Sequence, residues 1–134
     1  MAHARTRAKV LLWLALLIAF GLGSRRLSGL PDWITLYAGD VAWGAMFFAL
    51  FCAARPSLSI ASAWLAAVVT TELIEFSELC HSPWVDALRA TRVGGLLLGH
   101  VFLWSDVFCV ALGATLAAAA ELAWRNSSEV RASG

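Results

Sequence analysis

Six charged residues inside or beside long apolar runs are the candidates for binding or catalysis. They are Asp40, Glu75, Glu78, Arg89, Arg92 and Asp106. A charge at the centre of a bilayer costs about 2.5 to 3.5 kcal/mol on insertion scales, so such side chains persist mainly where they face a bundle interior or a wet cavity. We therefore expect these residues to form a polar site shielded from lipid, with the arginines available to pair with the acids.

A ridge of polar residues closes the third apolar run. Glu72, Glu75, Glu78 and His81 recur at every third position, so together they cover about half the circumference of a helix. One interpretation is a carboxylate and histidine cluster that meets Asp106 at one face of the membrane. The other is a helix end at the lipid headgroups, locked by ion pairs with the two arginines. Glu78-x-x-His81 has the spacing of di-iron bundles, but such sites need two of these motifs and further acids, so we predict no metal and no cofactor.

The most specific hypothesis joins the third apolar run, the connection after it and the fourth apolar run in one polar site. We expect Glu75 and Asp106 to be neighbours. Since two carboxylates in a low dielectric must share a proton or bind a cation, we also expect Arg89 or Arg92 to close onto them. A salt-bridged lock without a ligand is the competing interpretation. Asp40 lies inside an apolar run, and we expect it to face the bundle interior.

Composition places the chain in a membrane and excludes several functions. Of the 134 residues, 60% are hydrophobic and 14% are charged, against about 25% charged in soluble domains. The mean hydropathy is +0.75. A formal net charge of +1 provides no basic excess for binding nucleic acid.

The sequence contains none of the common short motifs of metal or catalytic sites. The three cysteines lack CxxC spacing, and there is no Gly-x-Ser-x-Gly turn, His-Glu-x-x-His motif or phosphate-binding loop.

The apolar runs predict an all-α integral membrane bundle of four transmembrane helices. The predicted spans are 8–24, 33–54, 57–80 and 103–124, which form a single domain over residues 1–124. The connection between the third and fourth spans is too apolar for an ordinary loop, so we expect an interfacial or re-entrant segment. A short polar tail, 125–134, is expected to be disordered. A signal peptide is the alternative for the first run, although no convincing cleavage site follows it.

Basic residues favour an orientation with both termini in the cytoplasm. Four spans put the termini on one side, where six basic residues would lie against four on the other. The six are Arg5, Arg7, Lys9, Arg55, Arg125 and Arg131, and the four are Arg25, Arg26, Arg89 and Arg92. This bias predicts a multi-pass protein of the inner (plasma) membrane.

The order of several short motifs resembles a known family. These motifs are Tyr37-Ala-Gly39-Asp40-Val-Ala-Trp43, Ile74-Glu75-Phe-Ser-Glu78-Leu79, Leu88-Arg89-Ala-Thr91-Arg92, Leu98-Gly99, Phe102-Leu-Trp104-Ser-Asp106 and Gly113. Together they resemble small bacterial membrane proteins catalogued as domain of unknown function 2809, from the first helix to about Trp124. The resemblance implies about four transmembrane helices and no established activity. In that family the third helix commonly ends in Glu-x-x-Gln, where this chain has Glu78 in place of the amide. A tyrosine commonly lies four residues after the aspartate of the last helix, where this chain has Val110.

A more distant likeness, in the order of acid, arginine and aspartate, is to VanZ-like envelope proteins. It favours a role at the cell envelope.

Three functions follow from the residues. The first is binding of a lipid or lipid-linked headgroup by the acidic and arginine cluster. The second is proton- or cation-coupled transport by a homo-oligomer that uses the intramembrane carboxylates, and the third is hydrolysis by a membrane-embedded enzyme. We favour headgroup binding, with membrane lipids and a lipid-linked ligand as partners and no nucleic acid. Whether the chain is an enzyme stays open at this point.

Overall fold

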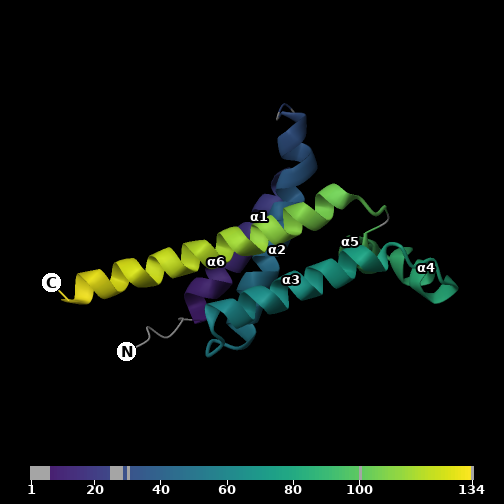
Figure 1. Ribbon diagram of the computed structural model, residues 1–134. Helices are drawn as coiled ribbons and strands as arrows, with labels where there is room; N and C mark the ends of the chain where they lie inside the picture. Colours follow the sequence, from purple (N-terminus) through teal and green to yellow (C-terminus); the bar gives the residue numbers. More distant parts are fainter. Residues whose placement is uncertain (1–6, 25–28, 30, 100, 134) are drawn as a thin grey trace.

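The computed structural model describes residues 7–24, 29, 31–99 and 101–133. Within those ranges all regular secondary structure is helical, with four long helices and two short ones (Figure 1). The helices are α1 (Arg7–Ser24), α2 (Asp32–Ala54), α3 (Ile60–Ser77), α4 (Pro83–Arg89), α5 (Arg92–Leu98) and α6 (Trp104–Ser133). The predicted all-α class is confirmed.

Local sequence explains where several helices begin and end. α2 ends just before Pro56, which cannot continue a helix. At the start of α3 the hydroxyl of Ser59 accepts a hydrogen bond from the backbone N–H of Ser62 at 3.0 Å. At the start of α5 the hydroxyl of Thr91 accepts one from the N–H of Gly94, also at 3.0 Å. These caps satisfy backbone donors that the first helical turn leaves unpaired.

α2 lies at the centre of the packing and contacts α1, α3 and α6. α3 and α6 run side by side, and α2 crosses them (Figure 1). At the crossing of α2 and α6, Gly44 lies against the backbone of Val110 and Gly113 lies against the backbone of Val41. A Cβ atom at either glycine would overlap the opposing carbonyl group. The two helices therefore meet backbone to backbone.

α3 is apolar on both of its faces, with small side chains inside and large ones outside. Ala63 and Ala67 are fully buried, and so is Thr71, whose hydroxyl donates to the carbonyl of Ala67 at 3.0 Å. On the outside, Leu65 is 55% exposed and Leu73 is 66% exposed. Apart from Glu72 and Glu75 near its end, α3 is therefore apolar all round, and a helix of this kind that packs through small residues is typical of a lipid environment.

Three helices in the described residues are long and apolar enough to cross a membrane. They are Asp32–Ala54, Ile60–Ser77 and Trp104–Val130. These correspond to the second, third and fourth predicted spans, although α3 starts three residues later than the predicted boundary because Ser57 to Ser59 form a turn and a cap. The apolar part of the first helix, Val10–Gly21, is shorter than the other three.

The connection between the third and fourth spans folds into α4 and α5, which pack against each other. α5 also packs against α3, so the apolar connection returns to the bundle. At the other end of α6 the expectation of a disordered tail is wrong, because the helix continues to Ser133. The ion pair between Arg125 and Glu121, at 2.9 Å, and hydroxyl bonds from Ser127 and Ser128 to preceding carbonyls support this extension.

We expect Gly113→Ala to destabilise the protein. The added methyl group overlaps the backbone of Val41, which cannot move without separating α2 from α6, and overpacking of this kind costs about 1 to 3 kcal/mol. The measurement is the thermal unfolding midpoint in detergent, where the variant should unfold at a lower temperature than the wild type.

Gly23→Ala is the matched control for this substitution. It also replaces a helical glycine, but nothing lies within 4 Å of the position that its Cβ would take. Since alanine is the better helix former, this variant should be as stable as the wild type or slightly more stable. Equal unfolding midpoints for both variants would contradict the close crossing.

Candidate functional site

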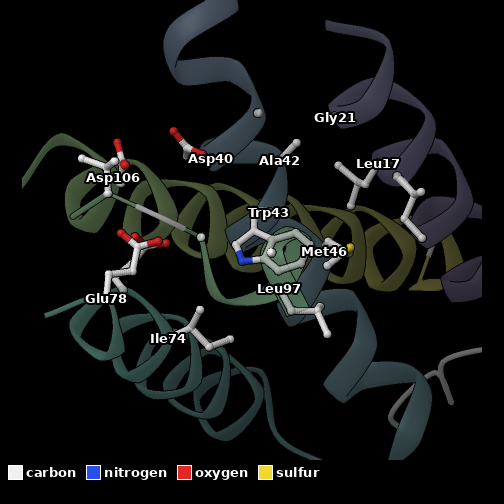
Figure 2. Close-up of a pocket in the computed structure, with 16 residues that line it drawn as sticks. Leu17, Gly21, Asp40, Ala42, Trp43, Met46, Ile74, Glu78, Leu97 and Asp106 are labelled. Carbon is white, nitrogen blue, oxygen red and sulfur yellow. The ribbon is translucent and has the colours of Figure 1, made fainter. Parts of the chain in front are cut away.

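A pocket of about 540 Å³ lies where α1, α2, α3, α5 and α6 meet. Its lining has two ends of different chemistry. Figure 2 shows Asp40, Glu78 and Asp106 gathered at one end, with Leu17 and Met46 at the other. The pocket can therefore receive a molecule that is polar at one end and apolar at the other.

Four of the six residues expected in the site line this pocket, and all four are acids. Asp40 comes from α2, Glu75 from the last turn of α3, Glu78 from the residue after α3, and Asp106 from the first turn of α6. Glu75 is 8% exposed and Glu78 is 7% exposed, whereas the two aspartates are half-buried. The structure thus brings Glu75 and Asp106 to a common pocket and places Asp40 at its wall.

The helical repeat of α3 aims its acids inward. Glu75 lies four residues after the buried Thr71 and therefore continues the small-residue stripe that faces α2 and α6. Glu78 follows one turn later, where the helix has just ended. Glu72 belongs to the same ridge but does not line the pocket, and His81 is exposed beside Asp86. Of the four residues of the predicted ridge, Glu75 and Glu78 therefore line the pocket, whereas Glu72 and His81 do not.

Aromatic packing sets where α6 begins. The rings of Phe76, Phe102 and Trp104 stack or meet edge to face, with centroids 5.3 to 6.3 Å apart. This cluster joins the end of α3 to the start of α6 and so places Asp106 beside the α3 acids. The hydroxyl of Ser105 donates to a carboxylate oxygen of Asp106 at 3.0 Å.

Glu78 lies in a confined position at the acidic end. Gly99, at the end of α5, has a φ of +62° and lies so close to the carboxyl group of Glu78 that a Cβ atom there would overlap it. Glycine satisfies both the backbone conformation and the close approach. The Oε2 atom of Glu78 is buried and has no hydrogen-bond partner among the described residues.

The pKa of Glu78 is raised to about 7, and burial is the largest cause. The neighbouring carboxylates of Asp106 and Asp40 contribute to this rise, while the guanidinium of Arg89 opposes it. Glu78 therefore exchanges a proton near neutral pH, or holds a negative charge there only with the help of a cation.

Neither arginine of the expected cluster lines the pocket. The guanidinium of Arg89 donates to the carbonyl oxygens of Ser77 and Cys80, the latter at 2.8 Å, and to Asp86 at 3.3 Å. Arg89 is buried and thereby caps the end of α3, since cations bind favourably to the carbonyls there. Arg92 is exposed at the start of α5. The expected closure of Arg89 or Arg92 onto the acids of the pocket is therefore not seen.

The pocket contains residues that the sequence did not single out. Leu17 and Ile18 come from α1, and Leu97 comes from the returning α5. Gly99 stood out only within the Leu98-Gly99 motif of the family resemblance, and its role against Glu78 depends on a fold that joins α5 to α3. Within the described residues no group of three or more His, Cys, Asp or Glu side chains could hold a metal ion.

We expect Glu78→Gln to flatten the dependence of stability on pH. Between pH 4.5 and about 7 the unfolded chain loses the Glu78 proton while the folded protein retains it, so wild-type stability falls as pH rises through this window. The full effect is on the order of 3 kcal/mol. The glutamine variant lacks this titration and should be more stable than the wild type at about pH 8, as measured by thermal or denaturant unfolding in detergent.

Glu129→Gln serves as the control because it neutralises an exposed carboxylate on α6. Its unfolding profile against pH should follow that of the wild type. A Glu78→Gln profile with the same slope as the wild type would mean that Glu78 titrates normally.

Comparison with known proteins supports the resemblance seen in the sequence. Residues 29–114 match the family described as protein of unknown function (DUF2809), a region that contains α2 to α5 and the start of α6, and all four acids of the pocket. No solved structure matches the chain. Because the match covers more than half of the sequence, this chain belongs to the DUF2809 family.

Proposed function

We propose that this protein binds the headgroup of a lipid or lipid-linked molecule at the cell envelope. The observation that carries the proposal is the two-ended pocket, with acids at one end and apolar side chains at the other, between helices apolar enough to cross a membrane. Its volume of about 540 Å³ is in the range of small-molecule sites. An amphiphile matches both ends, because its polar group can meet the acids while its hydrocarbon contacts the apolar wall.

The proposed setting is the inner (plasma) membrane of a bacterial cell, crossed four times with both termini in the cytoplasm. α1 would be the additional crossing. Its apolar part, Val10–Gly21, covers only about 18 Å at 1.5 Å per residue, so the flanking residues would complete the crossing with basic side chains that extend to the headgroups. Two supports are the packing of α1 along α2 and the exposed tryptophans Trp13, Trp33 and Trp124 near run ends.

A second candidate function is proton- or cation-coupled transport. It is favoured by one observation, the convergence of acids from α2, α3 and α6 on a single pocket in which the pKa of Glu78 is about 7. Since a single copy encloses little space, this function would use a homo-oligomer. The two candidates differ in a simple assay: a carrier moves protons or cations across sealed vesicles, and a headgroup-binding protein does not.

We expect Asp106→Asn to reduce the lipid that co-purifies with the protein. The substitution preserves side-chain shape but removes a charge from the acidic end, which should lower the bound fraction by about tenfold if one charge-assisted hydrogen bond is lost. Mass spectrometry of lipid extracted from equal amounts of wild type, Asp106→Asn and Glu129→Gln measures this. Equal lipid content in all three proteins would contradict headgroup binding in the pocket.

We also expect a reporter-fusion topology map to place four crossings in the chain. Fusions after residues 28, 56, 90 and 134 should report alternating sides, with the last on the cytoplasmic side. Sequencing of the mature N-terminus accompanies the map. Three crossings, or a mature chain that begins after residue 23, would remove α1 from the proposed arrangement.

A further inference from the structure

The helices that line the pocket contact one another in a row that does not close. Among the described residues the backbone of α1 comes close only to that of α2, and the backbone of α5 only to those of α3 and α4. Yet both α1 and α5 line the pocket, α1 through Leu17 and Ile18 and α5 through Gly95 and Leu97. We call the space between these two pairs of residues the α1–α5 gap. We propose that the pocket takes up a lipid sideways from the bilayer through this gap.

The first argument is the depth of the apolar end in the membrane. α2 has 23 residues and Trp43, which lines the pocket, is the central one, so it lies about 16 Å from either end of the helix at 1.5 Å per residue. Leu17 and Ile18 likewise lie more than one turn before the end of α1. Since the hydrocarbon core of a bilayer is about 30 Å thick, a side opening at this depth faces hydrocarbon.

The second argument is the orientation of the pocket. Glu78 directly follows α3 and marks the level at which that helix leaves the membrane. On α2, which runs from that face inward, Asp40, Trp43 and Met46 line the pocket in this order, from its acidic to its apolar end (Figure 2). A bound headgroup would therefore lie near the membrane surface with its hydrocarbon directed toward the centre. A lipid in that leaflet already has this orientation before it enters.

The third argument is the surface beside the gap. Leu16 and Phe20 are exposed on α1, and Val93 and Val101 are exposed within and just after α5. These side chains continue the apolar outer surface of the spanning helices up to the pocket. The hydrocarbon of a lipid could thus pass from the bilayer into the pocket without contact with water.

The size of the pocket favours an acyl chain over a second copy of this protein. An α-helix with its side chains is about 10 to 12 Å wide, so a volume of about 540 Å³ would hold little more than one turn of it. A single hydrocarbon chain is much thinner and fits lengthwise. The occupant that matches the depth, the orientation and the width of the pocket is a bilayer lipid.

The test follows lipid exchange by the full-length protein in vesicles. Protein purified with its unlabelled lipid is reconstituted into equal parts of chain-deuterated phosphatidylethanolamine and phosphatidylglycerol. After repurification, mass spectrometry gives the deuterated fraction of the retained lipid. Ile18→Cys combined with Leu97→Cys places one thiol on each side of the gap, and a bismaleimide bridges them. The exposed Cys80 and the half-buried Cys109 are replaced by alanine, whereas Cys52 is buried and stays.

We expect the bridged protein to exchange lipid about tenfold more slowly than the same variant without the reagent, because the bridge obstructs entry and exit. A bridge formed after exchange should instead retain the deuterated lipid when the protein is moved to unlabelled vesicles. Each single-cysteine variant, treated with the same reagent, controls for alkylation alone and should exchange faster than the bridged protein.

A second variant tests the gap without a chemical reagent. Leu97→Trp enlarges a side chain at the gap and should also slow exchange. Leu65→Trp is the matched control, because it makes the same change on the exposed face of α3, outside the pocket lining. It should exchange lipid at the wild-type rate.

This inference rests on the proposed headgroup binding, and the two proposals fail in different ways. If lipid retention depends on Asp106 but neither the bridge nor Leu97→Trp changes the exchange rate, headgroup binding stands and sideways entry is wrong. A bridge that joins two protomers, seen as a doubled mass, would make the gap an interface between copies and also overturn sideways entry. If no retained lipid depends on Asp106, the proposed function itself is wrong and this inference falls with it.

Discussion

The backbones of α2 and α6 touch where Gly44 meets Val110 and Gly113 meets Val41. In lipid there is no hydrophobic drive to bring helices together, so close van der Waals contact between small residues is what makes such packing stable. The same contact determines the site, because Asp106 lies one turn before Val110 and is carried on the same helix face. Separation of the two helices by a side chain would move one wall of the pocket away from the other.

The corner after α3 is the second determinant of the site. Arg89 binds the last carbonyls of α3, and the chain then returns through α5, whose end brings Gly99 against the carboxyl group of Glu78. An arginine that looked available to pair with acids is thus used to hold backbone. Burial in this corner is the largest cause of the raised pKa of Glu78, and the charge of Arg89 opposes the rise without reversing it.

Much of the fold could be predicted from local sequence. The runs that became α2, α3 and α6 are apolar over the length that a membrane requires, and proline or capping residues mark several of their ends. The extension of α6 beyond Trp124 was not predicted, because its polar composition resembles a loose tail. Its bonds, such as the pair between Glu121 and Arg125, form only once the helix has continued.

The sequence by itself determined that Asp40, Glu75 and Asp106 are the residues to examine, because the cost of a charge in lipid applies to each residue wherever the chain folds. The sequence could not decide that these acids share one pocket, or that Arg89 points at the end of α3 instead. Those outcomes depend on contacts between α2 and α6 and between α3 and α5, which lie far apart in the chain. Only the tertiary structure decides them, because periodicity describes the face of one helix and contains no information about which helix it will meet.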